Sequence, residues 1–281
     1  MTESKDNVRS ILETIGRVVA PVTLITALLY YFAWVRTAAI FSHFGVDQRI
    51  LAYSVEDYLL RSAGVAFRPL AFVLLAVATS IALWYGLARI ANRPNLVKPV
   101  ALLLVVLASC LLIYGVTVLF GLLHVRKPLW AGVALALGVI AAELAFSLFD
   151  HAGTSPSDKT IFTRRLLVGA GLLLALFWST AVYAQLSGQR LAVAWANVPR
   201  TQPSATILSE KDLKLTGHGI IATRLSFDGK GFEYQYDGLR LLVYSNSRWF
   251  LYPDSWSSDP LAKVIVLRDE STVRVEVRAT R

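Results

Sequence analysis

The chain has little of the chemistry on which disulfide-stabilised domains, metal centres and most enzymes depend. Its 281 residues include one cysteine, Cys110, which excludes an intramolecular disulfide. The four histidines are scattered, without ligand spacing or a nearby cysteine pair. No cofactor fingerprint stands in a suitable context, and no catalytic motif is present. The sequence therefore predicts a non-enzymatic protein with no catalytic, cofactor-binding or metal-binding residue.

Charge is also scarce, and its scarcity is concentrated in long apolar stretches. Charged residues make up 17% of the chain, and five stretches contain almost none. Each is about as long as the roughly 20 residues of helix that cross a hydrocarbon core. Five such runs with basic flanks favour membrane spans over the buried helices of a soluble protein. The predicted spans are Val18 to Val35, Leu70 to Ala88, Pro99 to Leu123, Leu129 to Phe149 and Leu166 to Ala184.

The distribution of lysine and arginine predicts an orientation. If the N-terminus is cytoplasmic, the inner segments hold nine basic residues and the outer loops hold six. Short loops rich in basic residues tend to stay in the cytoplasm. We therefore expect a multi-pass cell-membrane protein with a cytoplasmic N-terminus, and five crossings then put the C-terminal domain outside.

The segment between the first two predicted spans, residues 36–69, has a short helix signal. Ser54 followed by Asp57 resembles a capping box, and apolar Val55, Tyr58, Leu59 and Leu60 follow. This pattern predicts a helix lying at the membrane interface. The alternative is a lid or a partner-docking element over a cavity between helices.

The last part of the chain changes from apolar runs to alternation. A membrane domain of residues 1–186 is expected to be followed by a linker, 187–203, which contains Pro199 and Pro203, and by a soluble domain, 204–281. Short alternating segments there predict half-buried antiparallel strands. Hairpin turns are predicted at Asp228-Gly229, Asp237-Gly238 and, more weakly, Asn246-Ser247. The expected fold is therefore a five-helix transmembrane bundle followed by a small antiparallel β barrel or sandwich.

Two strings of this sequence carry a resemblance to a known group. FSHFGVDQRILAYSVEDYLLRSAGVAF begins at Phe41, and GLRLLVYSNSRWFLYPDSW begins at Gly238. Together they resemble a group of uncharacterised polytopic membrane proteins from actinobacteria. The resemblance implies a bacterial plasma membrane and one architecture of membrane helices plus a β-domain. It carries over no activity and no site residue.

One acidic residue stands inside a predicted span. Glu143 lies about 10 Å from the inner end of the fourth run at 1.5 Å per residue. An ionisable residue at this depth is a functional-site hypothesis by default, such as a proton or cation site. The alternative is a structural carboxyl, protonated or hydrogen-bonded to a neighbouring helix. The structural role is favoured because the apolar runs contain no basic partner for Glu143.

Two further features predict contacts. Small residues recur at four-residue spacing in the fourth and fifth runs, which suits close helix packing within the chain or between two copies. These stripes are Ala134, Gly138 and Ala142, and Gly171, Ala175 and Ser179. The C-terminal domain has a cluster of candidate recognition aromatics, for which a core role is favoured: Trp249, Phe250, Tyr252 and Trp256.

Charge and motifs narrow the possible functions to a few classes. The formal charge of +9 is largely loop charge near lipid headgroups, and no nucleic-acid-binding motif is present, so the bilayer is the expected partner. The favoured function is binding of a protein, an envelope component or a small ligand by the β-domain. Alternatives are a channel or transporter subunit centred on Glu143, a membrane enzyme acting on lipid, and a sensor or effector with its β-domain in the cytosol.

Overall fold

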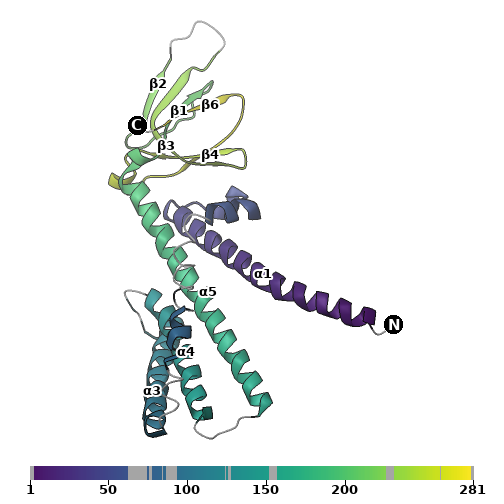
Figure 1. Ribbon diagram of the computed structural model, residues 1–281. Coiled ribbons are helices and arrows are strands. Elements are labelled where there is room, and N and C mark those ends of the chain that lie inside the picture. Colours follow the sequence, from purple (N-terminus) through teal and green to yellow (C-terminus); the bar gives the residue numbers. More distant parts are fainter. Residues whose placement is uncertain are drawn as a thin grey trace. The chain divides into compact units, whose positions relative to one another are not determined.

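The chain folds into long helices followed by an antiparallel sheet, as the sequence predicts (Figure 1). The computed structural model describes residues 3–62, 75, 78–83, 85–86, 94–123, 125, 128–151, 157–225, 231–259 and 261–279. The chain divides into two compact units. The helix unit comprises Met1–Phe32 and Arg61–Tyr183, and the sheet unit comprises Ala33–Leu60 and Ala184–Arg281.

Four helices in the described part of the chain are long and apolar enough to cross a membrane, where the sequence predicts five. They lie within α1 (Glu3–His43), α3 (Pro94–Leu119), α4 (Leu129–His151) and α5 (Asp158–Asn197). The predicted span Leu70 to Ala88 lies mostly outside the described residues. Its described parts, 75, 78–83 and 85–86, are helical. The predicted membrane location is thus supported by four spans.

Two of these helices extend well beyond their apolar runs. α1 has 41 residues and α5 has 40, so each is about 60 Å long, twice the thickness of a hydrocarbon core. Residues 187–197 of the predicted linker continue α5. The helix ends only before Pro199, which begins the 3₁₀ turn η2 (Pro199–Thr201). As a result, α1 and α5 each belong to both units, and the unit limits differ from the domain limits expected from sequence.

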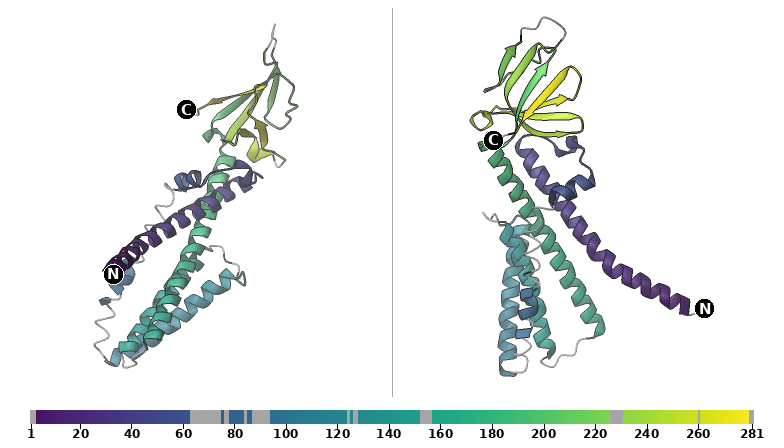
Figure 2. Two further views of the ribbon diagram at one scale, coloured as in Figure 1. Left: turned by 90° about the vertical axis from the view of Figure 1, so that its right-hand side faces the viewer. Right: turned by 45° about the horizontal axis from the view of Figure 1, so that its top comes forward.

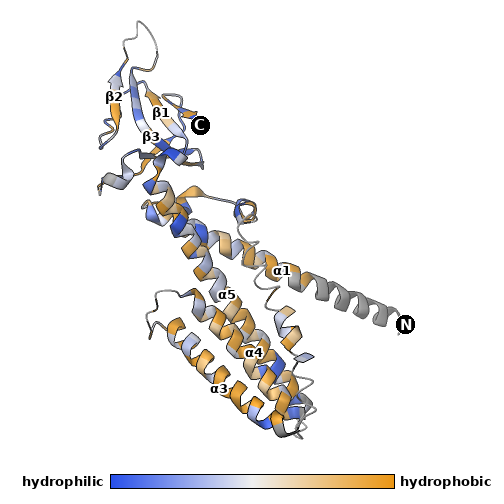
Figure 3. Ribbon diagram, turned by 60° about the vertical axis from the view of Figure 1, so that its left-hand side comes forward, coloured by the Kyte–Doolittle hydropathy of each residue, from blue (hydrophilic) through white to orange (hydrophobic). Residues whose placement is uncertain are grey.

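Small residues bring α3, α4 and α5 close together in the helix unit. Gly138 of α4 faces Leu112 of α3, and a Cβ added there would lie 2.9 Å from the Leu112 side chain. Gly171 of α5 is equally close to Val139 of α4. Ala175, the next member of the α5 stripe, is buried. The two predicted stripes are therefore used within the chain, on helices that Figure 3 colours mainly in the hydrophobic range.

A third stripe of small residues joins α1 and α5 in the sheet unit. It consists of Ala184, Gly188, Ala192 and Ala196, all buried and four residues apart. Gly188 makes the closest approach, because a Cβ there would lie only 2.5 Å from the backbone oxygen of Arg36. Removing the side chain thus lets the two helix backbones meet.

The segment after α1 follows its local sequence signals. The 3₁₀ helix η1 (Gln48–Leu51) begins after Asp47, whose carboxylate accepts from the Arg49 backbone nitrogen. Residues 55–62 are helical, and the predicted capping box is confirmed by reciprocal contacts between Ser54 and Asp57 at 3.0–3.2 Å. Tyr58 is buried but Leu60 is 77% exposed, so the predicted apolar residues do not all share one side.

The six strands form a single antiparallel sheet. They are β1 (Ser204–Ser209), β2 (Ile221–Arg224), β3 (Tyr234–Ser245), β4 (Arg248–Pro253), β5 (Ile265–Arg268) and β6 (Val273–Arg278). The order is β5-β4-β3-β1-β6, and β2 pairs with the first half of β3 (Figure 2). Within the described residues, β5 and β6 end the path and the outer edge of β2 is also unpaired, so the sheet is open.

The prediction of a closed barrel or a two-sheet sandwich is therefore wrong. One side of the sheet is buried although the sheet does not close. The segment between β1 and β2 covers that side with Leu213, Leu215 and Ile220. The Tyr236 hydroxyl, on the buried side, donates to Asp212 at 2.7 Å and so lowers the pKa of that carboxyl. The stabilisation from this bond is present above the unfolded aspartate pKa and is lost as the pH falls through the lowered pKa.

Of the three predicted turns, one is confirmed, one is wrong and one lies outside the described residues. Asn246 and Ser247 both have φ of +51° and join β3 to β4 in a two-residue hairpin, as predicted. Asp237-Gly238 instead lies inside β3, where the register with β1 shifts beside Thr206. Gly238, with φ of +83°, forms a bulge rather than a turn. Asp228-Gly229 lies outside the described residues.

We predict that Gly188→Ala lowers the thermal stability of the full-length protein in detergent micelles, by about 1–3 kcal/mol, because the added Cβ meets the Arg36 carbonyl. Gly169→Ala on the same helix is the matched control. Nothing lies within 4 Å of a Cβ at Gly169, so that change is expected to be neutral or stabilising. Equal unfolding temperatures for the two variants would contradict the close helix contact.

Candidate functional site

The helix ends and the sheet share one apolar core in the sheet unit. Phe44, which follows α1, contacts Tyr252 of β4 with ring centroids 5.3 Å apart and Trp256 at 5.1 Å. Phe250 and Tyr252 are completely buried in this cluster. We call it the junction core; its buried members are Ile40, Phe41, Phe44, Val46, Leu51, Ala192, Ala196, Leu242, Phe250 and Tyr252.

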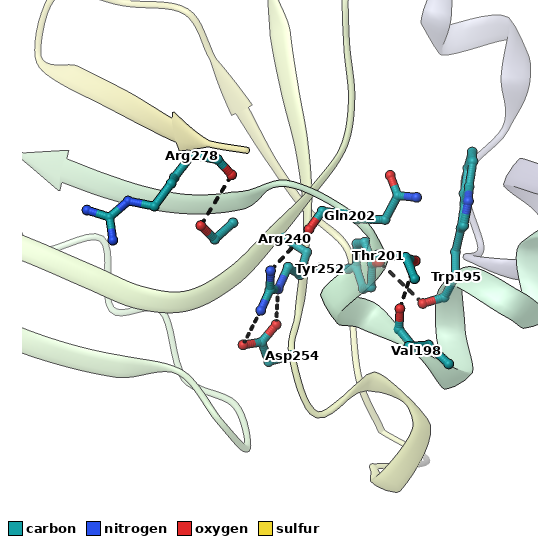
Figure 4. Close-up of polar contacts among 9 residues, drawn as sticks. Trp195, Val198, Thr201, Gln202, Arg240, Tyr252, Asp254 and Arg278 are labelled. Carbon is teal, nitrogen blue, oxygen red and sulfur yellow. Dashed lines mark hydrogen bonds and ion pairs between the residues drawn. The ribbon is translucent and has the colours of Figure 1, made fainter. Parts of the chain in front are cut away.

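Polar contacts reinforce the junction at the end of α5 (Figure 4). The Tyr252 hydroxyl donates to the backbone oxygen of Trp195 at 3.4 Å, and burial raises the pKa of this phenol above its ordinary value. Arg240 of β3 donates to the backbone oxygen of Gln202 at 3.1 Å. The same guanidinium forms a two-point ion pair with Asp254. The Tyr252 bond thus holds the sheet to α5, and the Arg240 bond holds it to the segment that follows η2.

The structure places the four candidate recognition aromatics mainly in packed positions. Phe250 and Tyr252 belong to the junction core, and Trp256 packs against it. Trp249 packs on the other side of the sheet and against Tyr244, with ring centroids 4.4 Å apart. Phe250 and Tyr252 are completely buried and out of reach of a ligand, whereas Trp249 and Trp256 are partly exposed.

One side of β1, β6 and the first half of β3 is polar. Thr206 donates to Asp237 at 2.8 Å, and Gln235 donates to the same carboxylate at 2.6 Å. Arg274 and Glu276 on β6 form an exposed ion pair at 3.0 Å. We call this surface the polar face; it comprises Ser204, Thr206, Gln235, Asp237, Arg240, Arg274, Glu276 and Arg278.

A small pocket of about 250 Å³ lies at the end of α5, where Asp254 pairs with Arg240 of the polar face. It is lined by Asn197, Val198, Pro199, Arg200 and Asp254. A cation and an anion line the same space, so a small polar group could bind there through charge-assisted hydrogen bonds. Among the described residues, no group of three or more metal-ligating side chains gathers in one place.

The helix unit holds a second polar cluster, around Glu143. Arg164 of α5 lies between two carboxylates of α4: its Nε is 3.1 Å from Glu143 Oε2, and its Nη1 is 2.6 Å from Asp150 Oδ2. All three side chains are about a quarter exposed. The Nε–H does not point at the Glu143 oxygen, so that contact is an ion pair without hydrogen-bond alignment. Glu143 therefore has a basic partner from outside the apolar runs.

The sequence contained a signal for this partner that the run-by-run reading missed. Glu143 and Asp150 are seven residues apart and so lie on one side of α4. The fourth and fifth apolar runs predicted from sequence are separated by residues 150–165, and Asp150 and Arg164 are about equally distant from the middle of this segment, between residues 157 and 158. In an antiparallel helix pair, residues equidistant from the loop lie opposite one another. Because Arg164 stands just before the fifth apolar run, hydropathy alone does not indicate that it faces Glu143 and Asp150.

Comparison with known proteins adds no relative. No family model matches the chain, and no curated protein or solved structure is significantly similar to it. The resemblance to the actinobacterial group therefore stays an expectation.

We predict that Arg164→Gln destabilises the full-length protein more than Glu143→Gln does. The first change leaves two carboxylates without a counter-charge, whereas the second leaves Arg164 paired with Asp150. The expected loss is about 1–2 kcal/mol, less than for a fully buried pair because the side chains are partly exposed. Thermal unfolding in micelles measures it.

Arg165→Gln is the matched control, because Arg165 is exposed and is the adjacent residue. A loss of stability equal to that of Arg164→Gln would mean that net charge, not the α4–α5 contact, is responsible. An Arg164→Gln protein as stable as the wild type would also contradict the cluster.

Proposed function

We propose that this chain is a non-enzymatic multi-pass membrane protein whose extracytoplasmic β-domain binds a protein, an envelope component or a small ligand. The observation that carries the proposal is the polar face with its adjoining pocket, displayed by a sheet that is packed on the ends of α1 and α5. The side chains of this face are oriented by bonds to one another, as Thr206, Gln235 and Asp237 are. Such preorganisation lowers the entropy cost of binding.

Residues of the polar face also take part in the contacts near the end of α5. Arg240 belongs to the polar face and also donates to the backbone oxygen of Gln202, which follows η2. Asp254 pairs with Arg240 and lines the pocket. A ligand that competes for Arg240 would therefore act directly on the bond between the sheet and the segment that follows η2. In this proposal, that bond couples ligand binding to the chain between α5 and β1.

A channel or transporter subunit centred on Glu143 is the alternative. The Arg164 contact supports a structural role for Glu143, because an arginine between two carboxylates offsets the charge that a proton or cation site would use. The second alternative, a sensor or effector with a cytosolic β-domain, has the same binding surface and differs only in orientation.

The test uses the fact that Cys110 is the single cysteine. In a Cys110→Ser background, Glu276→Cys puts one thiol on the polar face at an exposed position. A membrane-impermeant maleimide is expected to label it in intact cells, because the domain is outside. A photoactivatable cross-linker attached to the same thiol is then expected to give a discrete adduct, because the polar face is where the ligand binds.

Glu270→Cys, exposed in the turn before β6, is the control for the adduct. It is expected to be labelled equally but to give no adduct. Labelling only after cell lysis would overturn the orientation and favour the cytosolic sensor. Equal adducts from both positions, or none from Glu276→Cys, would refute binding at the polar face.

A further inference from the structure

Two arginines of the sheet face each other across neighbouring strands. Arg248 of β4 and Arg268 of β5 are directly opposite partners in the antiparallel ladder. Like charges in such a pair repel, because the Cβ atoms lie only about 5 Å apart. Among the described residues, neither guanidinium has an ion pair, whereas Arg224, Arg240 and Arg274 each pair with a carboxylate. The opposed pair therefore carries two uncompensated positive charges.

Alternation along the strands fixes the side on which these arginines lie. Trp249 and Leu267 pack into the core on the side covered by the β1–β2 segment. Phe250, the next residue of β4, packs into the junction core. Since successive side chains point to opposite sides of a strand, Arg248 and Arg268 share the side of Phe250. They lie on the side that packs against the helix ends.

This arginine pair is close to the end of a membrane span. The β3–β4 hairpin is bonded to η1, because Ser245 Oγ donates to the Leu51 oxygen at 2.6 Å and Asn246 donates to the Ile50 oxygen at 3.4 Å. η1 begins at Gln48, five residues after the candidate span Val22–His43 ends. Figure 1 shows β4 next to this end of α1.

Exposed side chains beside the pair have the composition of a membrane-facing surface. Arg49 of η1 is exposed and adds a third guanidinium. Ile50 is 41% exposed. Val266, two residues before Arg268 on β5, is 46% exposed. Basic residues mixed with exposed aliphatic ones suit the boundary between headgroups and acyl chains.

The spacing along α1 puts the pair within reach of lipid headgroups. The apolar run predicted from sequence ends before Arg36, and the candidate span ends at His43, so Phe44 lies at most about 12 Å beyond the apolar part of α1 at 1.5 Å per residue. The headgroup layer accounts for about 5–8 Å of this on one side of a bilayer. Long arginine side chains that extend toward the interface span the remaining gap.

We propose that Arg248 and Arg268, with Arg49 beside them, bind the phosphate of anionic phospholipid headgroups. The charges are complementary, and a phosphate between the two guanidinium groups replaces repulsion by charge-assisted hydrogen bonds. The bound lipid holds the sheet unit at the bilayer surface beside the end of α1. This site is separate from the polar face. The proposal does not depend on the side of the membrane on which the sheet unit lies.

The test measures unfolding temperatures of the purified full-length protein in zwitterionic micelles as phosphatidylglycerol or phosphatidylcholine is added. Phosphatidylglycerol is expected to raise the unfolding temperature of the wild type more, because it binds the folded state. In Arg248→Gln/Arg268→Gln, the phosphatidylglycerol concentration that gives half of the effect is expected to rise at least about tenfold. In phosphatidylcholine alone, this variant is expected to be at least as stable as the wild type, because the repulsion is gone.

Arg224→Gln/Lys211→Gln is the matched control, since it removes the same charge from two exposed positions elsewhere in the sheet unit and outside the polar face. It is expected to respond to phosphatidylglycerol as the wild type does. Equal responses from all three proteins would overturn the site. If sodium phosphate at matched ionic strength raised the unfolding temperature as much as phosphatidylglycerol does, the ligand would be a free anion and the lipid proposal would be wrong. Lower stability of Arg248→Gln/Arg268→Gln in phosphatidylcholine would assign the pair a structural role instead.

Discussion

The contact of Phe44 with Tyr252 and Trp256 is the interaction on which the sheet unit depends. It joins the end of α1 to β4 and η3 (Trp256–Ser258) through three aromatic rings, with α5 closing the same core through Ala192 and Ala196. Burying aromatic surface of this size is among the larger single contributions to a fold. Because helices and strands share this core, the polar face and the Arg248–Arg268 pair have fixed positions relative to the end of the candidate span.

Small residues and charges play complementary parts in the helices. Gly188 lets the backbones of α1 and α5 come into contact. Lipid tails are as apolar as leucine, so the hydrophobic effect does not drive helices together in a bilayer, and such close packing must do so. Arg164 joins α4 to α5 by charge at the depth of Glu143. The charge cluster gives Glu143 a partner that restrains it within the helix unit.

Local signals were readable from sequence, and long-range ones were not. Ser54–Asp57 and Asn246-Ser247 depend on neighbours along the chain, so their capping bond and positive φ angles follow from residue type. Asp237-Gly238 has the same local signature, but the facing strand turns it into a bulge. The extension of α5 was hidden because Gln189 and Arg190 make residues 187–197 read as polar, although Ala184, Gly188, Ala192 and Ala196 keep helical spacing.

The burial of Phe250 against the end of α1 needed the tertiary structure, because no period of 2 or 3.6 residues encodes it. The partner of Glu143 follows from sequence only when the fourth and fifth apolar runs are treated as an antiparallel pair. Hydrogen exchange of the full-length protein in micelles tests the shared core most directly. Amides of residues 187–197 are expected to exchange as slowly as those of β4, because opening either requires breaking the junction core. Exchange of 187–197 at the rate of an unstructured linker, while β4 stays protected, would contradict the account.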